Sequence, residues 1–254
     1  WIQQQELNAS DGAALDRFGT SVSISGDTAI VGAWQDDTPA GNDAGSAYIF
    51  TRTGGVWNQQ QKLTASDAAA TDWFGFSVSI SGDTAIVGAR TDNTPAGGEA
   101  GSAYVFTRTG GVWSQQLQLT ASDAAAMDRF GASVSINGDT AIVGAWADDT
   151  TAGIDAGSAY VFTRTGGVWS QQQQLTASDA AAVDRFGHSV SINGDTAIVG
   201  AWADDTVAGA DVGSAYIFTR MGGVWTQQQK LTASDAAAND EFGLSVSISG
   251  DSAI

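Results

Sequence analysis

A repeat of 56 residues constrains this chain more than any other feature of its sequence. Four full units and 30 residues of a fifth account for all 254 residues. A fixed period of this length is the signature of a repeat architecture, in which each unit buries apolar surface against its neighbours. We therefore expect one continuous array whose core lies between units. The period is marked by Trp1, Trp57, Trp113, Trp169 and Trp225, and by Phe18, Phe74, Phe130, Phe186 and Phe242.

Four segments of each unit have the pattern of strands. The third segment of the first unit alternates, with Tyr48 and Phe50 on one face and Ala47 and Ile49 on the other, which is the period of a strand. Tight turns at Gly-Asp and Gly-Gly pairs follow the first and third segments, and a longer acidic loop, residues 34–45, follows the second. No segment has a helical period. The predicted strands of the first unit are residues 18–24, 28–33, 46–53 and 56–65.

These units predict an all-β fold, a β-propeller built of four-stranded antiparallel blades. Strands that are apolar on both faces, with the Gln-rich strand last, are typical of a blade that packs between two others. We expect the Gln-rich strand to be solvated at the outer rim of the blade. A β-solenoid is the structural alternative, but its repeats are usually shorter and lack this hairpin pattern. The predicted blades are approximately residues 18–65, 74–121, 130–177 and 186–233, with a partial blade from residues 242–254 and 1–9.

The two ends of the chain match different parts of that partial blade. Residues 1–9 align with a fourth strand and residues 242–254 with the first two strands, so a third strand is missing. Two arrangements stay open: a five-bladed ring that the ends close together, and an arc of a larger propeller, within the range of about four to eight blades. We favour the arc of a longer chain, because the cut leaves a blade unfinished.

Composition excludes several classes of protein. A hydrophobic content of 43%, with nine Trp and ten Phe, is enough for a packed core despite a net charge of −18. The chain has no Cys, so disulfides, thiolate metal sites and a cysteine nucleophile are excluded. No apolar run approaches the ~20 residues of a membrane helix, and membrane insertion is not expected. The acidity argues against a nucleic-acid partner, because its phosphates would be repelled.

Two dipeptides of each unit resemble the FG-GAP repeat. Phe18-Gly19 is followed by Gly32-Ala33, and the same pairs recur in register in the next three units. The FG-GAP repeat is the blade of the integrin alpha-chain propeller and of many bacterial surface proteins. The resemblance therefore implies a secreted or cell-surface protein, with the signal segment not present in this chain. The sequence departs from the family twice: Trp or Arg stands where the family has Pro, and the Asp-rich calcium loop before the Gly-Ala strand is missing.

Acidic residues concentrate in the connections that share one face of an up-and-down propeller. We expect 22 of the 28 acidic residues there, with only four bases, Arg17, Arg90, Arg129 and Arg185, so that the net charge lies on this face. Carboxylates crowded in Gly-containing loops favour a hard cation such as calcium, although Asp is also a common turn residue. The predicted ligand sets are Asp36, Asp37 and Asp43; Asp92, Asn93 and Glu99; Asp148, Asp149 and Asp155; and Asp204, Asp205 and Asp211. Asp11 and Asp16 are expected to cap turns.

One position at the mouth of each acidic loop carries a large side chain. It is Trp34, Arg90, Trp146 or Trp202, and these are the candidate ligand-facing residues. An exposed indole could stack on a sugar ring or anchor a protein. The alternative, which we prefer, is a wedge between neighbouring blades. The single histidine, His188, has no counterpart in other units and is expected to be a tolerated variant.

The sequence offers no nucleophile and base, and acids repeated in every blade suit binding better than one catalytic centre. We therefore expect no enzyme. The first hypothesis is a non-catalytic extracellular adhesion or binding module that holds calcium and takes a protein or glycan on its acidic face. The alternatives are a structural repeat protein that assembles laterally into fibres or oligomers through its Gln-rich strands, and a lectin that uses the Trp-bearing loops.

Overall fold

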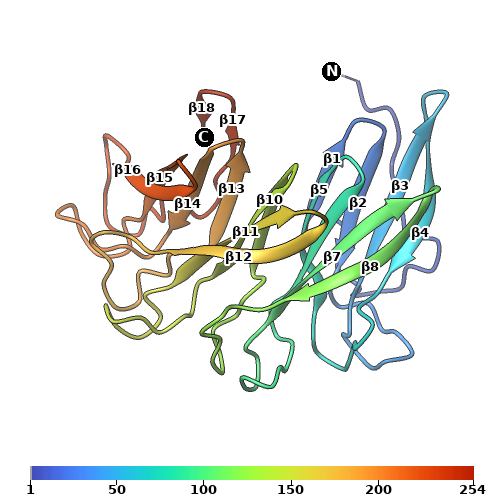
Figure 1. Cartoon of the computed structure of the whole chain (residues 1–254), viewed down its shortest axis with the longest axis horizontal. Coiled ribbons are helices and arrows are strands. Elements are labelled where there is room, and N and C mark those ends of the chain that lie inside the picture. Colours follow the sequence, from blue (N-terminus) through green and yellow to red (C-terminus); the bar gives the residue numbers. More distant parts are fainter. Residues whose placement is uncertain (1) are drawn as a thin grey trace.

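The computed structural model describes residues 2–254, which form an all-β structure without helices (Figure 1). Four antiparallel sheets of four strands follow one another along the chain, and within each sheet the strands pair in sequence order. We call these sheets blades 1 to 4. A small hairpin near the C-terminus follows blade 4. The predicted fold class is confirmed.

The strand bounds repeat from blade to blade. Blade 1 contains β1 (Val22–Ser25), β2 (Thr28–Ala33), β3 (Ser46–Thr53) and β4 (Val56–Leu63). Blade 2 contains β5 (Phe74–Ser81), β6 (Thr84–Ala89), β7 (Ser102–Thr109) and β8 (Val112–Leu119). Blade 3 contains β9 (Ser133–Asn137), β10 (Thr140–Ala145), β11 (Ser158–Thr165) and β12 (Val168–Leu175). Blade 4 contains β13 (Ser189–Asn193), β14 (Thr196–Ala201), β15 (Ser214–Met221) and β16 (Val224–Leu231), and the hairpin contains β17 (Ile248–Ser249) and β18 (Ser252–Ala253).

The first strand of each blade is the one that the sequence predicted least well. A strand was expected from Phe18, but β1 starts at Val22, and only β5 includes its Phe-Gly pair. The reason is the backbone of the Phe-Gly pair: Gly19 has a φ of +90°, outside the strand region, while its N–H donates to the Gly32 carbonyl at 3.0 Å. Gly75 has a φ of +92°, and β5 includes it only through a shift of the pairing register between Phe74 and Ser77. The second and third strands of the first unit have the predicted bounds.

The hydrophobic core lies between blades. From blade 1, Ile30, Ile49 and Leu63 pack against Tyr104 and Phe106 of blade 2 in one buried cluster. Equivalent clusters join blade 2 to blade 3 and blade 3 to blade 4. Tyr48 and Phe50 face the opposite side of blade 1 from Ile49, which confirms the predicted alternation of β3.

The Phe-Gly and Gly-Ala pairs meet at these interfaces. A Cβ added to Gly32 of β2 would lie 2.0 Å from the carbonyl oxygen of Gly75 in the next blade, and the same contact recurs between Gly144 and Gly187 at 1.9 Å. Only a residue without a side chain permits this approach of two backbones. The motif therefore marks the points where one blade touches the next.

Side chains also bridge neighbouring blades through hydrogen bonds. On the innermost strands, Ser23 Oγ accepts the Ile80 N–H at 3.1 Å. On the outermost strands, Gln61 donates to the Trp113 carbonyl at 2.7 Å and accepts the Trp113 N–H at 3.0 Å, as one strand does to another. The Gln-rich strands, which we expected to be solvated or to pair with another chain, thus use part of their side chains to link blades.

The N-terminal segment was expected to form a fourth strand and does not. No strand is present in residues 2–9, and Trp1 lies outside the described residues. The segment nevertheless lies where the outer strand of a preceding blade would lie, because Leu7 and Ala9 pack against the core face of blade 1 and Gln5 makes the paired bonds to Trp57. No hydrogen bond among the described residues joins residues 2–10 to residues 242–254.

Candidate functional site

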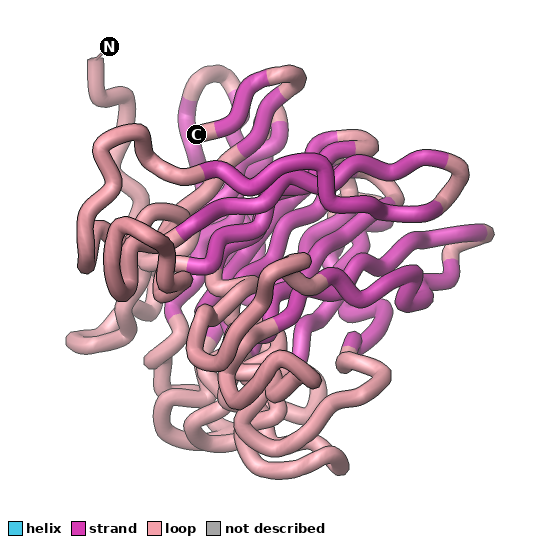
Figure 2. Tube along the Cα trace, turned by 90° about the vertical axis from the view of Figure 1, so that its left-hand side faces the viewer, coloured by secondary structure: helices cyan, strands magenta, loops and turns pink. Residues whose placement is uncertain are grey.

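The long loops and the returns between blades gather at one end of the strands, which we call the loop face (Figure 2). This end carries the acidic residues that the sequence assigned to it. The predicted charge balance needs one correction, because Lys62 and Lys230, at the ends of β4 and β16, also reach it. Lys62 Nζ lies 2.7 Å from carboxylate oxygens of both Asp11 and Asp36. The face is therefore less negative than predicted.

The first acid of each predicted calcium set is buried and already has partners. Asp36 accepts a hydrogen bond from Ser46 and forms an ion pair with Lys62. In blade 2 a glutamine replaces the lysine, and Asp92 accepts from Tyr104 at 3.0 Å and Gln118 at 3.1 Å. Burial raises the pKa of Asp92, against the effect of these hydrogen bonds. Asp148 and Asp204 occupy the same place in blades 3 and 4.

The second and third residues of each set shape the loop. Asp37 Oδ1 accepts the backbone N–H of Asp43 at 2.9 Å, and Asn93 does the same for Glu99. An amide replaces the carboxylate without loss of the bond, so this contact needs no charge. Asp149 with Asp155, and Asp205 with Asp211, repeat it. Within residues 2–254 no three acidic or histidine side chains converge closely enough to hold a metal ion. Calcium binding stays a prediction.

A fourth kind of acid closes the return between blades. Asp16 Oδ2 accepts the Ala13 N–H at 2.6 Å, which confirms its predicted role as a turn cap. Asp72, Asp128 and Asp184 make the same bond in later units. Burial raises the pKa of each of these three carboxyls to about 6, with the nearby acids adding to the effect. Asp11, the other predicted cap, instead accepts from Tyr48 and Lys62.

The candidate ligand-facing residues lie among aromatic and arginine side chains. The Trp34 ring lies 4.6 Å from Trp73 and 5.8 Å from Phe76 of the next unit, centroid to centroid, so it wedges between blades as we preferred. The guanidinium of Arg185 lies over both Trp146 and Trp202, at 5.1 and 4.8 Å. These contacts hold the indoles half-buried rather than free.

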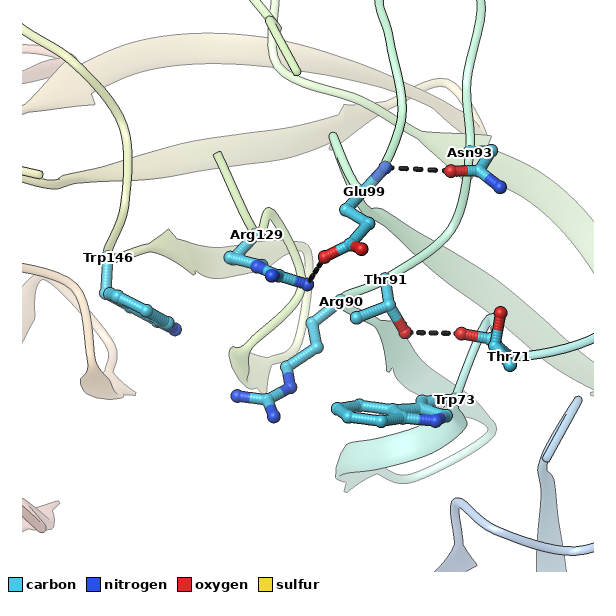
Figure 3. A pocket seen from close by; sticks show the side chains of 8 residues that line it. All are labelled: Thr71, Trp73, Arg90, Thr91, Asn93, Glu99, Arg129 and Trp146. Atoms are coloured by element: carbon cyan, nitrogen blue, oxygen red, sulfur yellow. Dashed lines mark hydrogen bonds and ion pairs between the residues drawn. The ribbon is translucent and has the colours of Figure 1, made fainter. Parts of the chain in front are cut away.

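A cavity of about 500 Å³ opens among these side chains between blades 2 and 3 (Figure 3). We call it the arginine–tryptophan cavity. In Figure 3, Arg90 extends between Trp73 and Trp146, while Arg129 turns to Glu99 and forms an ion pair with it. It is lined by Thr71, Trp73, Arg90, Thr91, Asn93, Glu99, Arg129 and Trp146.

Several residues of this cavity were not singled out from the sequence as binding residues. Trp73 and Arg129 directly precede Phe-Gly pairs. Arg129 was counted only among the bases of the acidic face, and Trp73 was not considered, although it stands where the other full units have Arg. A break in the repeat could have identified these residues. The second unit, whose strands form blade 2 and which we call unit 2, also carries Phe76, Asn93 and Glu99 where the other units have different residues. The cavity is therefore lined by residues at which unit 2 differs from the other units.

Comparison with known proteins agrees with the internal repeat. The family model described as the FG-GAP repeat matches residues 1–50, 57–106, 113–162, 169–218 and 225–254. No significant match to a curated protein is found. In residues 2–254 no helix is long and apolar enough to cross a membrane. FG-GAP repeats are an integrin-like adhesion or binding module and typically occur in extracellular or surface proteins. Because the matches cover nearly the whole chain, this protein belongs to the FG-GAP repeat family.

Proposed function

We propose that the chain is a non-catalytic, extracellular binding or adhesion module that takes its partner on the loop face. The observation that carries this is the place where the units differ. Strands and turns are nearly identical from blade to blade, whereas Trp73, Arg90 and Glu99 break the repeat and meet at one cavity. A scaffold with side chains varied at one cleft is the arrangement expected of a binding site.

The non-catalytic part of the proposal rests on the groups at that cavity. They are arginine, tryptophan, threonine, asparagine and one glutamate that is paired with Arg129. General acid–base chemistry requires groups whose pKa values lie near the working pH, and a second carboxylate or a histidine beside Glu99 would be needed. The lining of the cavity contains neither.

For calcium, we propose fewer ligand residues than the sequence alone suggested. Because Asp36, Asp92, Asp148 and Asp204 are committed to buried hydrogen bonds, calcium would use other carboxylates of the loop, such as the exposed Asp149 and the half-buried Asp155. These two are already neighbours, since Asp149 accepts the Asp155 N–H. Backbone carbonyls would supply the further oxygen ligands that calcium prefers.

Lateral assembly through the Gln-rich strands has less support. Gln60, Gln61 and Gln116 donate hydrogen bonds to the next blade of the same chain, so part of their hydrogen-bonding capacity is used without a second molecule. The lectin alternative keeps its support, because Trp146 lines the cavity.

An array of purified matrix proteins and glycans tests the proposal. We expect the labelled chain to bind at least one of them, and we expect Trp146→Ala, which removes a wall of the cavity, to abolish that signal. Gln116→Ala, on the outer strand β8, is the matched control and should bind as the wild type does. Binding to nothing on the array, or equal loss in both variants, would refute a ligand site on the loop face.

A further inference from the structure

Unit 2 exchanges two residues that the other full units hold in a fixed order. Units 1, 3 and 4 have Arg before the Phe-Gly pair and Trp after the Gly-Ala pair, whereas unit 2 has Trp73 first and Arg90 second. Arginine still stacks on tryptophan in both orders: Arg90 lies 4.8 Å from the Trp73 ring, and Arg185 lies 4.8 Å from Trp202. Stacking alone therefore does not require the exchange.

The exchange changes which side chain faces the arginine–tryptophan cavity. It puts the guanidinium of Arg90 into a space that Arg129 of the next unit also lines. Glu99 pairs with Arg129, and it is a glutamate where the corresponding residues, Asp43, Asp155 and Asp211, are one carbon shorter. The cavity thus holds two cations and one anion.

Among the described residues, Arg90 has aromatic partners but no anionic one. Its guanidinium lies 4.0 Å from the Phe76 ring as well as over Trp73, and its Nε is buried without a hydrogen-bond acceptor. Burial, together with the charge of Arg129, lowers the pKa of Arg90 to about 10. A buried donor left without an acceptor is costly, and a guanidinium matches a carboxylate with two parallel hydrogen bonds.

We propose that the arginine–tryptophan cavity binds a hexuronate, a sugar ring that carries one carboxylate, with the carboxylate on Arg90 and the ring beside Trp146. This inference rests on the proposed binding function and names its ligand class. The cavity, at about 500 Å³, has the size of a small-ligand site. Thr71, Asn93 and Glu99 supply polar groups for sugar hydroxyls.

The surrounding charge favours a single carboxylate over a polyanion. Exposed aspartates such as Asp37 and Asp149 populate the loop face around the arginines, and they would repel an extended acidic chain. One carboxylate on a neutral ring reaches Arg90 with less repulsion. An acidic side chain of a protein carries the same group but no hydroxyls for Asn93 and Glu99, and we treat it as a competing outcome.

Titration calorimetry, with NMR observation of the arginine Nε–H signals, tests the proposal. The titrants are sodium D-glucuronate, neutral D-glucose, and the amide of N-acetyl-aspartate as the protein-like carboxylate. We expect glucuronate to bind and to shift the Arg90 Nε–H signal, glucose to bind at least about tenfold more weakly, as for loss of a hydrogen bond to a charged group, and the aspartate derivative to bind more weakly than glucuronate.

The variant Trp73→Arg with Arg90→Trp gives unit 2 the order of the other units and keeps composition and charge. We expect it to weaken glucuronate binding at least about tenfold. If it melts earlier than the wild type, Arg90→Gln replaces it, and Arg52→Gln, at a distant surface ion pair with Asp27, is the control that should bind normally.

Equal binding of glucose, tighter binding of the aspartate derivative, or unchanged affinity in the exchanged variant would overturn the hexuronate assignment. Absence of glucuronate binding by a chain that still binds the array through Trp146 would overturn it while leaving the proposed function intact. Absence of both signals would refute both.

Discussion

At the scale of single residues, one position shows how the repeat is held together and where it is weakened. Gln61 and Gln173 each make two hydrogen bonds to the backbone of a tryptophan in the next blade, Trp113 and Trp225. The corresponding residue of unit 2 is Leu117, which makes neither bond and is 38% exposed. The interface between blades 2 and 3 therefore lacks a link that its neighbours have.

Leu117→Gln should restore this link. We expect the free energy of unfolding to rise by about 1–3 kcal/mol, because the link consists of two hydrogen bonds and each contributes a net stabilisation of about 0.5–1.5 kcal/mol. Gln61→Leu is the reverse change and should lower it by a similar amount. Urea denaturation of both variants beside the wild type measures the effect. Equal stability of all three would mean that the glutamines contribute nothing to blade packing.

The raised pKa values of three carboxyls predict a pH dependence of stability. Asp72, Asp128 and Asp184 have pKa values of about 6 in the folded protein, above the value of about 4 of an unfolded chain. Between these pH values the carboxyls bind a proton more tightly in the folded state than in the unfolded state. The contribution of the three carboxyls to the free energy of unfolding therefore falls as pH rises from about 4 to about 6. The contribution of Asp11 and Asp179 runs the other way, because hydrogen bonds to lysine lower their pKa values although burial opposes the shift.

Asparagine at positions 72, 128 and 184 isolates this effect, because its side-chain oxygen still accepts the capping N–H. We expect the triple variant to lose less stability than the wild type as pH rises from 4 to 7. Chemical denaturation at several pH values gives the comparison. Parallel curves for the two proteins would show that these carboxyls do not titrate differently in the folded state.

At the scale of strands and turns, the sequence predicted correctly those features that depend on a local residue pattern. The alternation of β3 predicted which face each side chain takes, and the Gly turns predicted the hairpins. It failed for the Phe-Gly pairs, because Gly19 has a φ of +90°, outside the strand region, although its N–H still donates to the Gly32 carbonyl of β2. It also read the glutamines as solvated, since sequence pattern does not show that an amide can imitate a strand partner.

The candidate site was predictable only in part for a related reason. Trp34, Arg90, Trp146 and Trp202 share one position of the repeat, so the sequence identified them together. Trp73 and Arg129 come from the position before the Phe-Gly pair, 17 residues earlier in each unit. The two positions become neighbours only in the folded chain, where the end of a connection between blades lies beside the end of the second strand of a blade. This arrangement forms the cavity.

Glycine at the contact between blades gives the sharpest prediction for an element. Gly144→Ala would place a Cβ 1.9 Å from the carbonyl oxygen of Gly187, and two backbones must separate to admit it. We expect a loss of about 4 kcal/mol or more in unfolding free energy. Gly166→Ala, in a hairpin turn with open space and a φ of +59°, is the control and should cost about 1–2 kcal/mol. Similar losses in both variants would contradict the role we give to this contact.

At the scale of the whole molecule, the protein is an array in which the same interface recurs between blades, while charge and sequence variation concentrate at the loop face. The array explains why the strands are so alike, because each must fit the same neighbour. The loop face is freed from that constraint. This separation of scaffold and variable surface is the basis of the proposed binding function.

Calcium provides one test at this scale. If these loop carboxylates hold calcium, one site filled at 100 times its dissociation constant adds about 2.7 kcal/mol to stability. The melting temperature should then rise with excess calcium relative to EDTA. Asp149→Asn with Asp155→Asn keeps the loop hydrogen bond and should reduce that rise. Identical melting in calcium and EDTA, with no heat of binding, would end the calcium proposal.

The most direct test of the central claim is the footprint of a bound partner, measured by hydrogen–deuterium exchange with the array ligand that binds most strongly. We predict slower exchange in residues 71–73, 90–99, 127–129 and around residue 146, all at the loop face. Exchange in the hairpin turns at the opposite end and in the outer strands β4, β8, β12 and β16 should not change. Protection confined to those strands or turns would contradict the account.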